Sequence, residues 1–215
     1  HQLAYAHLGD FYCSNCQFKR GKVIDFSQEK ISYPMEGLYN VYNTNAILLL
    51  IKSLISVENK AINQWLKIFS PTFGRQEEII YKNRKVFILL SKNPAGFNQS
   101  IQTVSEILKS KKANFLIVLN NQIPDGQDVS WIWDVDFAPI LSSAKNIYVS
   151  GDRVYDLNLR LRYEDDKKKI LTFENLPDAI ESTVNKTKVG ERFFILPTYS
   201  AMLEVRKILV GKKFL

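Results

Sequence analysis

Histidine, cysteine and methionine are scarce in this 215-residue sequence, which contains only two of each. Both histidines, His1 and His7, lie at the start of the chain, far in sequence from its carboxylate-rich segments. A Ser-His-Asp or Cys-His catalytic set therefore cannot be assembled from these residues. The sequence also lacks the Gly-x-x-x-x-Gly-Lys-Ser/Thr loop that cradles nucleotide phosphates. If the protein is an enzyme, key parts must come from elsewhere.

Long hydrophobic runs are absent as well. The longest apolar stretch, 46–55, is interrupted by Lys52 and is well short of the roughly 20 residues that a membrane-spanning helix needs. The sequence thus predicts no transmembrane segment. The chain begins with His1, and the residues that follow resemble neither a signal sequence nor a transit peptide. We therefore expect a truncated chain.

The composition is that of a globular protein, with 46% hydrophobic and 12% aromatic residues, enough for a sizeable core in one or two domains. The formal net charge of +7 favours anionic partners such as nucleotides, phospholipid headgroups, nucleic acid or a diphosphate-bearing substrate. The basic residues are scattered in short runs, which are usually solvated surface. Charge alone does not select among these partners.

The first part of the chain predicts a small β element followed by two helices. Short strands are expected at 3–12, 22–26 and 30–33, and apolar-rich helices at 40–55 and 58–69. Pro71 and Gly74 then interrupt the pattern. We place a domain boundary there, between residues 1–72 and 73–215.

Beyond this boundary, strands and helices alternate along the chain. This order predicts a Rossmann-like α/β domain with a mostly parallel sheet and helices on both faces. We expect strands at 86–90, 115–119, 147–149, 170–173 and 193–196, and helices at 97–109, 130–141, 154–163, 177–184 and 200–209. Polar segments at 91–98, 120–128 and 150–153 follow three of the strands, at the carboxyl edge where such sheets bind ligands.

Cys13 and Cys16 form a Cys-x-x-Cys pair, a spacing that lets two thiolates bind one zinc ion from a tight turn. Zinc needs two further ligands. His7 is a candidate for a third ligand, but a second cysteine pair before His1 is more natural for a zinc ribbon and would supply both. A redox pair and two inert thiols are the alternatives.

Two asparagines, Asn40 and Asn43, lie in the segment that begins with Gly37, at the start of the first predicted helix. An amide both donates and accepts, so Asn40 is a candidate for contacting an adenine edge. The alternative is that Asn40 or Asn43 caps the helix.

The segment Gly74-Arg75-Gln76-Glu77 lies at the expected domain boundary. A guanidinium there can bridge two domains and clamp a phosphate, which makes Arg75 a candidate nucleotide ligand. The alternative is an ordinary loop arginine.

A carboxylate-rich segment, 125–136, carries Asp125, Asp128, Asp134 and Asp136 together with two tryptophans. Four carboxylates so close together could bind magnesium or orient a histidine. The alternatives are that Asp128 caps a helix, that Asp125 begins a turn, and that the tryptophans fill the core or a partner's groove.

Together these segments resemble the MurT family of Mur ligase-like proteins over essentially the whole chain. Residues 37–46 are similar to the Gly-x-x-Asn-x-x-Asn-Ala motif that ends the central ATP-binding domain of Mur ligases, and 74–77 to the linker into their C-terminal domain. Segments 90–98 and 125–134 are similar to segments that distinguish MurT from ordinary Mur ligases. The resemblance implies that residues 1–72 end the central domain and that 73–215 form the C-terminal domain.

The resemblance also implies a function. The family amidates the α-carboxylate of D-glutamate in lipid II with ATP and Mg²⁺, at the cytoplasmic face of the membrane. A glutaminase partner, GatD, supplies ammonia from glutamine. By the same resemblance, Asp128 completes the partner's catalytic triad, Asn40 contacts adenine, Arg75 contacts phosphate, and Cys13 and Cys16 are half of a four-cysteine zinc ribbon.

One position departs from the pattern of Mur ligases. Leu89 stands where many of them have an aspartate that holds the ribose, and Lys92 or Asn93 is a substitute candidate. A conventional Mur or folylpolyglutamate ligase is the alternative enzyme. A basic zinc-ribbon module that binds nucleic acid is the alternative of another class, and we expect no nucleic-acid binding because basic and aromatic residues are not interleaved.

Overall fold

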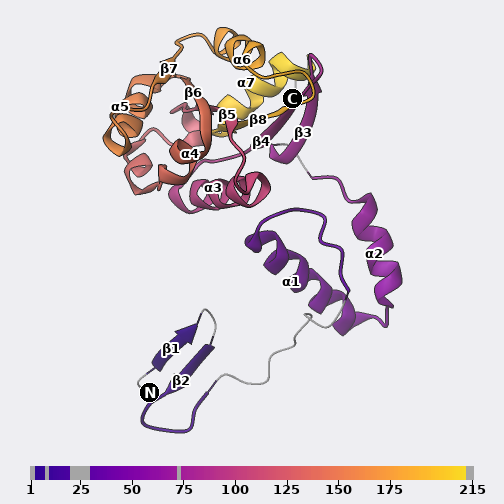
Figure 1. Ribbon diagram of the computed structural model, residues 1–215. Coiled ribbons are helices and arrows are strands. Elements are labelled where there is room, and N and C mark those ends of the chain that lie inside the picture. Colours follow the sequence, from indigo (N-terminus) through magenta and orange to yellow (C-terminus); the bar gives the residue numbers. More distant parts are fainter. Residues whose placement is uncertain (1–2, 8–9, 20–29, 72–73, 212–215) are drawn as a thin grey trace.

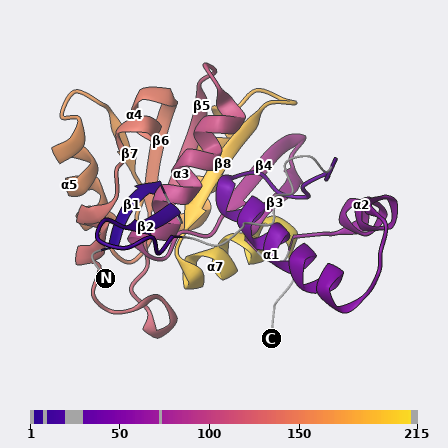
Figure 2. The ribbon, with the colours of Figure 1, turned by 90° about the horizontal axis from the view of Figure 1, so that it is seen from below.

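The computed structural model describes residues 3–7, 10–19, 30–71 and 74–211. Its largest element is a six-stranded sheet in the order β3-β4-β8-β5-β6-β7, which can be followed in Figures 1 and 2. Its strands are β3 (Arg75–Tyr81), β4 (Arg84–Leu89), β5 (Ala113–Val118), β6 (Ala144–Ser150), β7 (Ile170–Thr172) and β8 (Arg192–Pro197). Only the β3–β4 pair is antiparallel.

Helices cover both faces of this sheet (Figure 1). One core contains residues of α3 (Pro94–Leu108), α4 (Ala138–Ser143) and α5 (Val154–Glu164), and the other contains residues of α6 (Leu176–Asn185) and α7 (Tyr199–Val210). Central strand β5 is buried along its whole length, with Phe115 in the first core and Leu116 in the second. A continuous apolar strand is what a sheet covered on both faces requires. The predicted α/β fold class is confirmed.

Strand β3 was not predicted. It pairs with β4 through a turn at Lys82 and Asn83, whose positive φ angles of 46° and 59° suit a tight hairpin. As an edge strand it is only partly buried and carries Glu77 and Glu78. It therefore lacks the continuous apolar character of β4 and β5.

The single helix predicted at 130–141 is wrong. The segment forms a 3₁₀ helix, η2 (Ser130–Asp134), and then the short helix α4. Pro139 has no N–H to donate to the carbonyl of Val135, so a continuous helix would lose a hydrogen bond at this point. That carbonyl instead accepts from the guanidinium of Arg160 at 2.7 Å. The other predicted strands and helices of this domain are present within a few residues of their expected ends.

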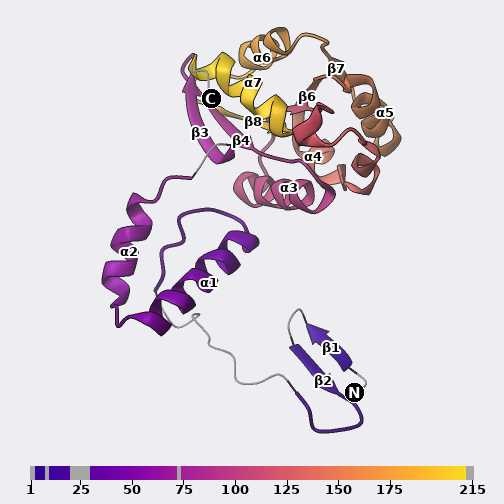
Figure 3. The same ribbon diagram turned by 180° about the vertical axis from the view of Figure 1, so that it is seen from behind.

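The first part of the described chain contains a hairpin, β1 (Leu3–His7) with β2 (Asp10–Cys13), and the helices α1 (Leu38–Leu54) and α2 (Asn59–Ile68). The hairpin lies apart from the large sheet in Figures 1 and 3. The predicted strand 22–26 falls outside the described residues, and the predicted strand 30–33 is wrong because these residues form no ladder.

Helices α1 and α2 share a small core in which Leu48 and Ile62 are buried. The expected domain boundary falls at residues 72 and 73, outside the described residues. Over the described ranges, none of the helices has the length and apolarity needed to cross a membrane.

Candidate functional site

The carboxyl ends of β5, β6 and β8 are joined by a buried amide, Asn120. Its backbone N–H donates to the hydroxyl of Thr198 at 3.0 Å, and its side-chain nitrogen donates to the hydroxyl of Ser200 at 3.1 Å. Its side-chain oxygen accepts from the backbone N–H of Asp152 at 3.0 Å. The loops after these three strands are therefore held together at the edge where the sequence placed ligand binding.

Asp125 is used within the domain. It ends the 3₁₀ helix η1 (Ile123–Asp125), and its carboxylate accepts from the backbone N–H of Ser200 at 2.8 Å and from the hydroxyl of the same residue. Ser200 lies in the first turn of α7, so Asp125 caps that helix from a separate segment. Gly126 follows with φ at +86°, which fits the predicted turn.

Asp128 is exposed on the loop between η1 and η2. One carboxylate oxygen accepts from the backbone N–H of Ser130 at 2.8 Å. Hydrogen bonds from Ser130 hold the pKa of Asp128 below its ordinary value, and the positive charge of Arg153 acts in the same direction. Asp128 is therefore an ionised, outward-facing carboxylate at neutral pH. Val129 is the N-cap residue of η2, but Ser130 is the first residue of that helix, so Asp128 satisfies its first N–H, as the alternative of helix capping predicts.

The remaining carboxylates of this segment, Asp134 and Asp136, do not form a group of three or more with the others. Asp136 accepts from the backbone N–H of Ala138 at 3.1 Å, and its own N–H donates to the side chain of Asn98 at 2.9 Å. The side chain of Asp134 is exposed. Among the described residues, no group of three or more His, Cys, Asp or Glu side chains is placed to bind a metal ion. The structure gives no support to magnesium binding by this segment.

The two tryptophans of η2 have different surroundings. Trp131 is partly buried against the core and its ring lies 6.3 Å from that of Phe97. Trp133 is 47% exposed and meets the ring of Tyr163 edge to face at 5.2 Å. Trp131 is thus a core residue, whereas Trp133 is on the surface.

In the Gly-Arg-Gln-Glu segment, three of the four residues pack or bond against other parts of the chain. A Cβ on Gly74, whose φ is +69°, would lie 2.7 Å from Met202. The side chain of Gln76 donates to the carbonyl of Glu36 at 2.6 Å, and Glu77 forms an ion pair with Arg206.

Arg75 differs from its neighbours in this segment. It is exposed, and within the described part of the chain its side chain has no hydrogen bond or ion pair. The guanidinium is therefore available to a ligand at the surface.

Asn40 is buried in the first turn of α1, and its amide nitrogen donates to the carbonyl of Glu36 at 2.6 Å. The N-cap of the helix is Gly37, so the predicted alternative that Asn40 or Asn43 caps the helix is wrong. Glu36 receives bonds from both Asn40 and Gln76. The two predicted nucleotide motifs therefore meet at one residue.

The segment that follows β4 begins helix α3. Asn93 caps this helix by accepting from the N–H of Gly96 at 2.7 Å, and Leu89 is buried in the sheet. Lys92 is exposed. Of the two substitutes considered for ribose binding, Lys92 is the one whose side chain forms no hydrogen bond or ion pair with the residues that the structure describes.

Cys13 and Cys16 lie on either side of the turn that follows β2. The backbone N–H of Cys13 donates to the carbonyl of Phe18 at 2.7 Å, which closes the turn. Cys13 is buried and Cys16 is exposed. Within the described residues, no third His, Cys, Asp or Glu side chain is placed with this pair to bind a metal ion.

The sequence analysis did not identify Asn98, Asn120 or Arg160 as important. All three bond to the backbone of the carboxylate-rich segment or of its neighbouring loops. The sequence could have indicated a buried role for Arg160, because this residue lies between Leu157 and Leu161 on the buried side of α5. A charged residue at such a position needs internal partners.

Two solved ligases have a similar fold. Folylpolyglutamate synthase of Mycobacterium tuberculosis, solved with ADP and AMPPCP, matches 86% of this chain and 43% of its own, with a TM-score of 0.66 and 18% identity. The UDP-N-acetylmuramate-alanine ligase MurC of Thermotoga maritima matches 81% of this chain and 37% of its own, with a TM-score of 0.60 and 17% identity. The chain thus has the fold of the Mur and folylpolyglutamate ligases.

The sequence comparisons identify the family of this chain. Residues 90–202, more than half of the sequence, match the family model described as MurT ligase C-terminal, and the chain belongs to this family. The MurT subunit of the glutamine-hydrolysing lipid II isoglutaminyl synthase of Streptococcus pneumoniae is 29% identical over 97% of this chain. Its counterpart in Staphylococcus aureus is 28% identical over 85%. The chain spans about half the length of these relatives.

Proposed function

We propose that this chain is the C-terminal part of the ligase subunit of a lipid II isoglutaminyl synthase. The observation that carries the proposal is the family match, which includes the exposed and ionised Asp128. The MurT relatives support the same assignment. In this proposal residues 1–72 end a central ATP-binding domain and residues 73–215 form the C-terminal domain.

The proposed reaction converts the α-carboxylate of D-glutamate in the lipid II stem peptide into an amide. A carboxylate is a poor electrophile until its oxygen becomes a good leaving group. Transfer of the terminal phosphoryl group of ATP to that oxygen gives an acyl phosphate. Ammonia then attacks the carbonyl carbon, the C–O bond breaks, and phosphate leaves with the electron pair.

Asn40 and Arg75 are the residues proposed to contact the nucleotide. Two observations support this role. Asn40 and Gln76, the neighbour of Arg75, both donate to the carbonyl of Glu36, and the guanidinium of Arg75 is exposed. Asn40 would position the adenine and Arg75 the phosphates. Mg²⁺ would neutralise phosphate charge, and we assign it no ligand among the described residues.

Asp128 is proposed to act on a different chain, the glutaminase GatD. That subunit would supply a nucleophilic cysteine and a histidine, and Asp128 would orient the histidine and stabilise its imidazolium form. The exposure of Asp128 and its lowered pKa support this role, since a triad carboxylate must reach the histidine and be ionised. Glutamine hydrolysis in the partner would then release the ammonia.

Zinc and localisation belong to the same proposal. Cys13 and Cys16 would be two of four zinc ligands, with the other pair in the remainder of a longer protein. The subunit would act in the cytoplasm at the inner face of the membrane, where the lipid II headgroup is presented.

The fold similarity to folylpolyglutamate synthase favours a conventional amino-acid ligase as the second candidate. Copurification of the full-length chain with the glutaminase subunit of the same genome, followed by glutaminase assays with and without the chain, separates the two. We expect a stable complex and glutaminase activity that depends on the chain. A chain that leaves the glutaminase unbound and unchanged would exclude our proposal and favour the conventional ligase.

A further inference from the structure

Basic residues gather at the edge of the large sheet where its parallel strands begin. Strands β4 to β8 all run parallel, so the segments that lead into or begin these strands lie at one edge. The hairpin turn between β3 and β4 lies at the same edge. The segments are 82–85, 109–112, 144–145, 165–169 and 186–192. We call these five segments together the amino edge.

The amino edge has a larger positive charge than the whole chain. Its five segments contain thirteen basic residues and three carboxylates, a net charge of +10, whereas the full sequence has a net charge of +7. Glu78 and Glu181, outside these segments, form ion pairs with residues of the amino edge. A net charge of +8 remains when both are counted. Lysine runs that are scattered along the sequence therefore converge in the fold.

Bonds between the segments join the amino edge into one surface. The side chain of Arg84 donates to the carbonyl of Thr187 at 3.0 Å, and Lys145 forms an ion pair with Glu191 at 3.0 Å. Segment 186–192 is thereby bonded to 82–85 on one side and to 144–145 on the other. The five segments are thus neighbours in space as well as at the same edge.

Two of the lysine runs are close enough to affect each other. The side chain of Lys168 donates to the carbonyl of Ala144 at 3.0 Å. Burial lowers the pKa of Lys168, and the positive charge of Lys112 acts in the same direction. Lysines of 109–112 and 165–169 therefore repel one another, and an anion that binds between them relieves this repulsion.

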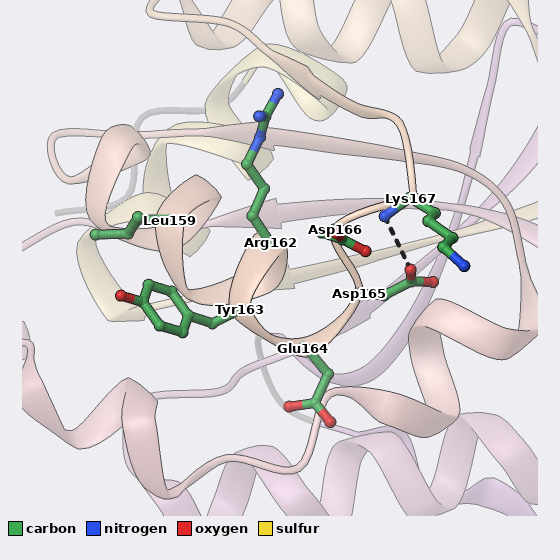
Figure 4. Close-up of a pocket in the computed structure, with 7 residues that line it drawn as sticks. All are labelled: Leu159, Arg162, Tyr163, Glu164, Asp165, Asp166 and Lys167. Carbon is green, nitrogen blue, oxygen red and sulfur yellow. Dashed lines mark hydrogen bonds between the residues drawn. The ribbon is translucent and has the colours of Figure 1, made fainter.

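Much of this charge is not neutralised within the chain. The side chains of Lys109, Lys111 and Lys112 are exposed, and they form no hydrogen bond or ion pair with the residues that the structure describes. Asp165 accepts from the backbone N–H of Lys167 at 3.1 Å (Figure 4), rather than from a lysine side chain. A concentration of unpaired positive charge attracts an anionic partner.

Two features favour a lipid surface over nucleic acid as that partner. Val189 is 67% exposed between Lys188 and Gly190. Peripheral proteins bind anionic bilayers by this combination of basic residues and an exposed apolar side chain. None of the five segments contains an aromatic residue that could stack on a base.

We propose that the amino edge binds the anionic headgroups of a membrane surface. Its lysines face the headgroups, and Val189 enters the interface. This inference rests on the proposed function, whose substrate is a lipid, and adds to it the surface that holds the subunit at the membrane. Arg75 pairs with Leu89 at the end of β4, and Asp128 lies in the loop that leaves the end of β5. A bilayer bound at the amino edge therefore leaves both residues accessible.

The test is sedimentation of the full-length protein with vesicles of two compositions. One contains phosphatidylglycerol and phosphatidylcholine in equal parts, and the other contains phosphatidylcholine alone. We expect the native protein to bind the anionic vesicles only, and to bind them more weakly as the salt concentration rises from about 0.05 M to about 0.5 M. This comparison needs no variant.

A triple variant, Lys109→Gln, Lys111→Gln, Lys112→Gln, removes three exposed charges of the amino edge. It should bind the anionic vesicles about a hundredfold more weakly, since each lysine near an anionic surface contributes about fivefold. The matched control, Lys30→Gln, Lys60→Gln, Lys67→Gln, removes the same charge from exposed lysines outside the amino edge. This control should bind like the native protein.

Three results would overturn the inference: native protein that does not bind anionic vesicles, equal binding to both kinds of vesicle, or a triple variant that binds like the native protein. A DNA duplex that displaces the native protein from the vesicles at equal phosphate concentration would show that nucleic acid is the preferred partner. All these results leave the proposed function standing, because association with the glutaminase decides it. Vesicle binding as expected, by a protein that leaves the glutaminase unbound, would overturn the proposed function instead.

Discussion

At the scale of single residues, Asp125 and Asp128 show how surroundings decide what a carboxylate does. Asp125 is committed to Ser200 at the start of α7. Asp128, three positions later, is exposed and bonded only locally to Ser130 within the described residues. Both carboxylate oxygens of Asp125 are bonded to Ser200, whereas Asp128 is exposed, so of these two residues Asp128 is the one that fits the proposed triad.

Glu204 provides a pH-dependent prediction. Desolvation raises the pKa of Glu204 above its ordinary value, and the nearby charge of Asp152 acts in the same direction. Because the folded-state pKa is raised, the contribution of Glu204 to stability is fully present below its unfolded pKa and is lost as the pH rises through the folded pKa.

Glu204→Gln should therefore raise the melting temperature at about pH 7, with a gain that shrinks toward about pH 4, where the native side chain is protonated. The substituted amide oxygen can still accept from Asn120, as Glu204 does at 3.2 Å. Melting curves of both proteins across this range check the prediction. A variant that melts below the native protein at neutral pH would contradict it.

Two glycines with positive φ form a matched pair for a second prediction. A Cβ on Gly151 would lie 2.5 Å from the carbonyl oxygen of Leu119, whereas a Cβ on Gly126 would meet nothing within 4 Å. Gly126→Ala should cost about 1 kcal/mol of backbone strain. Gly151→Ala should cost about 2 kcal/mol more, because the backbone must also move. Equal losses in chemical denaturation would show that the close approach at Gly151 is unimportant.

At the scale of elements, the break between η2 and α4 positions the candidate site. Pro139 prevents a continuous helix, and the carbonyls of Ile132 and Val135 are satisfied by Arg160. The resulting turn presents Trp133 outward while Trp131 packs inward. A single helix would have given these side chains different directions.

Replacing Arg160 tests this arrangement. Arg160→Met would leave the two carbonyls without their buried donor, and we expect a loss of roughly 3 kcal/mol in the free energy of unfolding. Arg162→Met is the control, because Arg162 is exposed on the same helix, and it should change stability by less than about 0.5 kcal/mol. Comparable losses in both variants would argue against a special role for Arg160.

The sequence predicted most elements of the sheet and the helices around it, because buried parallel strands such as β4 and β5 are continuous apolar runs. It did not predict β3, which is half-exposed and carries charged residues. The helix predicted at 130–141 ignored Pro139, a local signal for the break. What the sequence could not show is that the carbonyl of Val135 accepts from Arg160, 25 residues away. Local patterns do not contain such long-range bonds.

At the scale of the whole molecule, the candidate residues fall into two groups. The motifs of Asn40 and Arg75 meet at Glu36, on the side of α1 and β3. Asp128 lies in the loop after β5, beside α5. The sequence motifs suggested both groups of residues. Only the structure shows that Asn40 and Gln76 donate to the same carbonyl, that of Glu36. In the proposed function the first group serves ATP and the second serves the partner.

The two groups therefore predict separable defects in the complete enzyme. Loss of Asp128 should stop the supply of ammonia from glutamine and leave the ligase reaction intact. The exposed Asp134 lies in the same segment with its side chain in solvent, so Asp134→Asn is the matched control for the loss of one charge.

Amidation of lipid II by the full-length complex, measured for Asp128→Asn with glutamine and with added ammonium as nitrogen source, tests the central claim most directly. We expect glutamine-dependent amidation to fall by at least about a thousandfold, as when a triad carboxylate loses its charge, while ammonium-dependent amidation and the Asp134→Asn control stay near the native rate. Equal loss with both nitrogen sources, or full activity with glutamine, would contradict the role of Asp128 in the partner's active site.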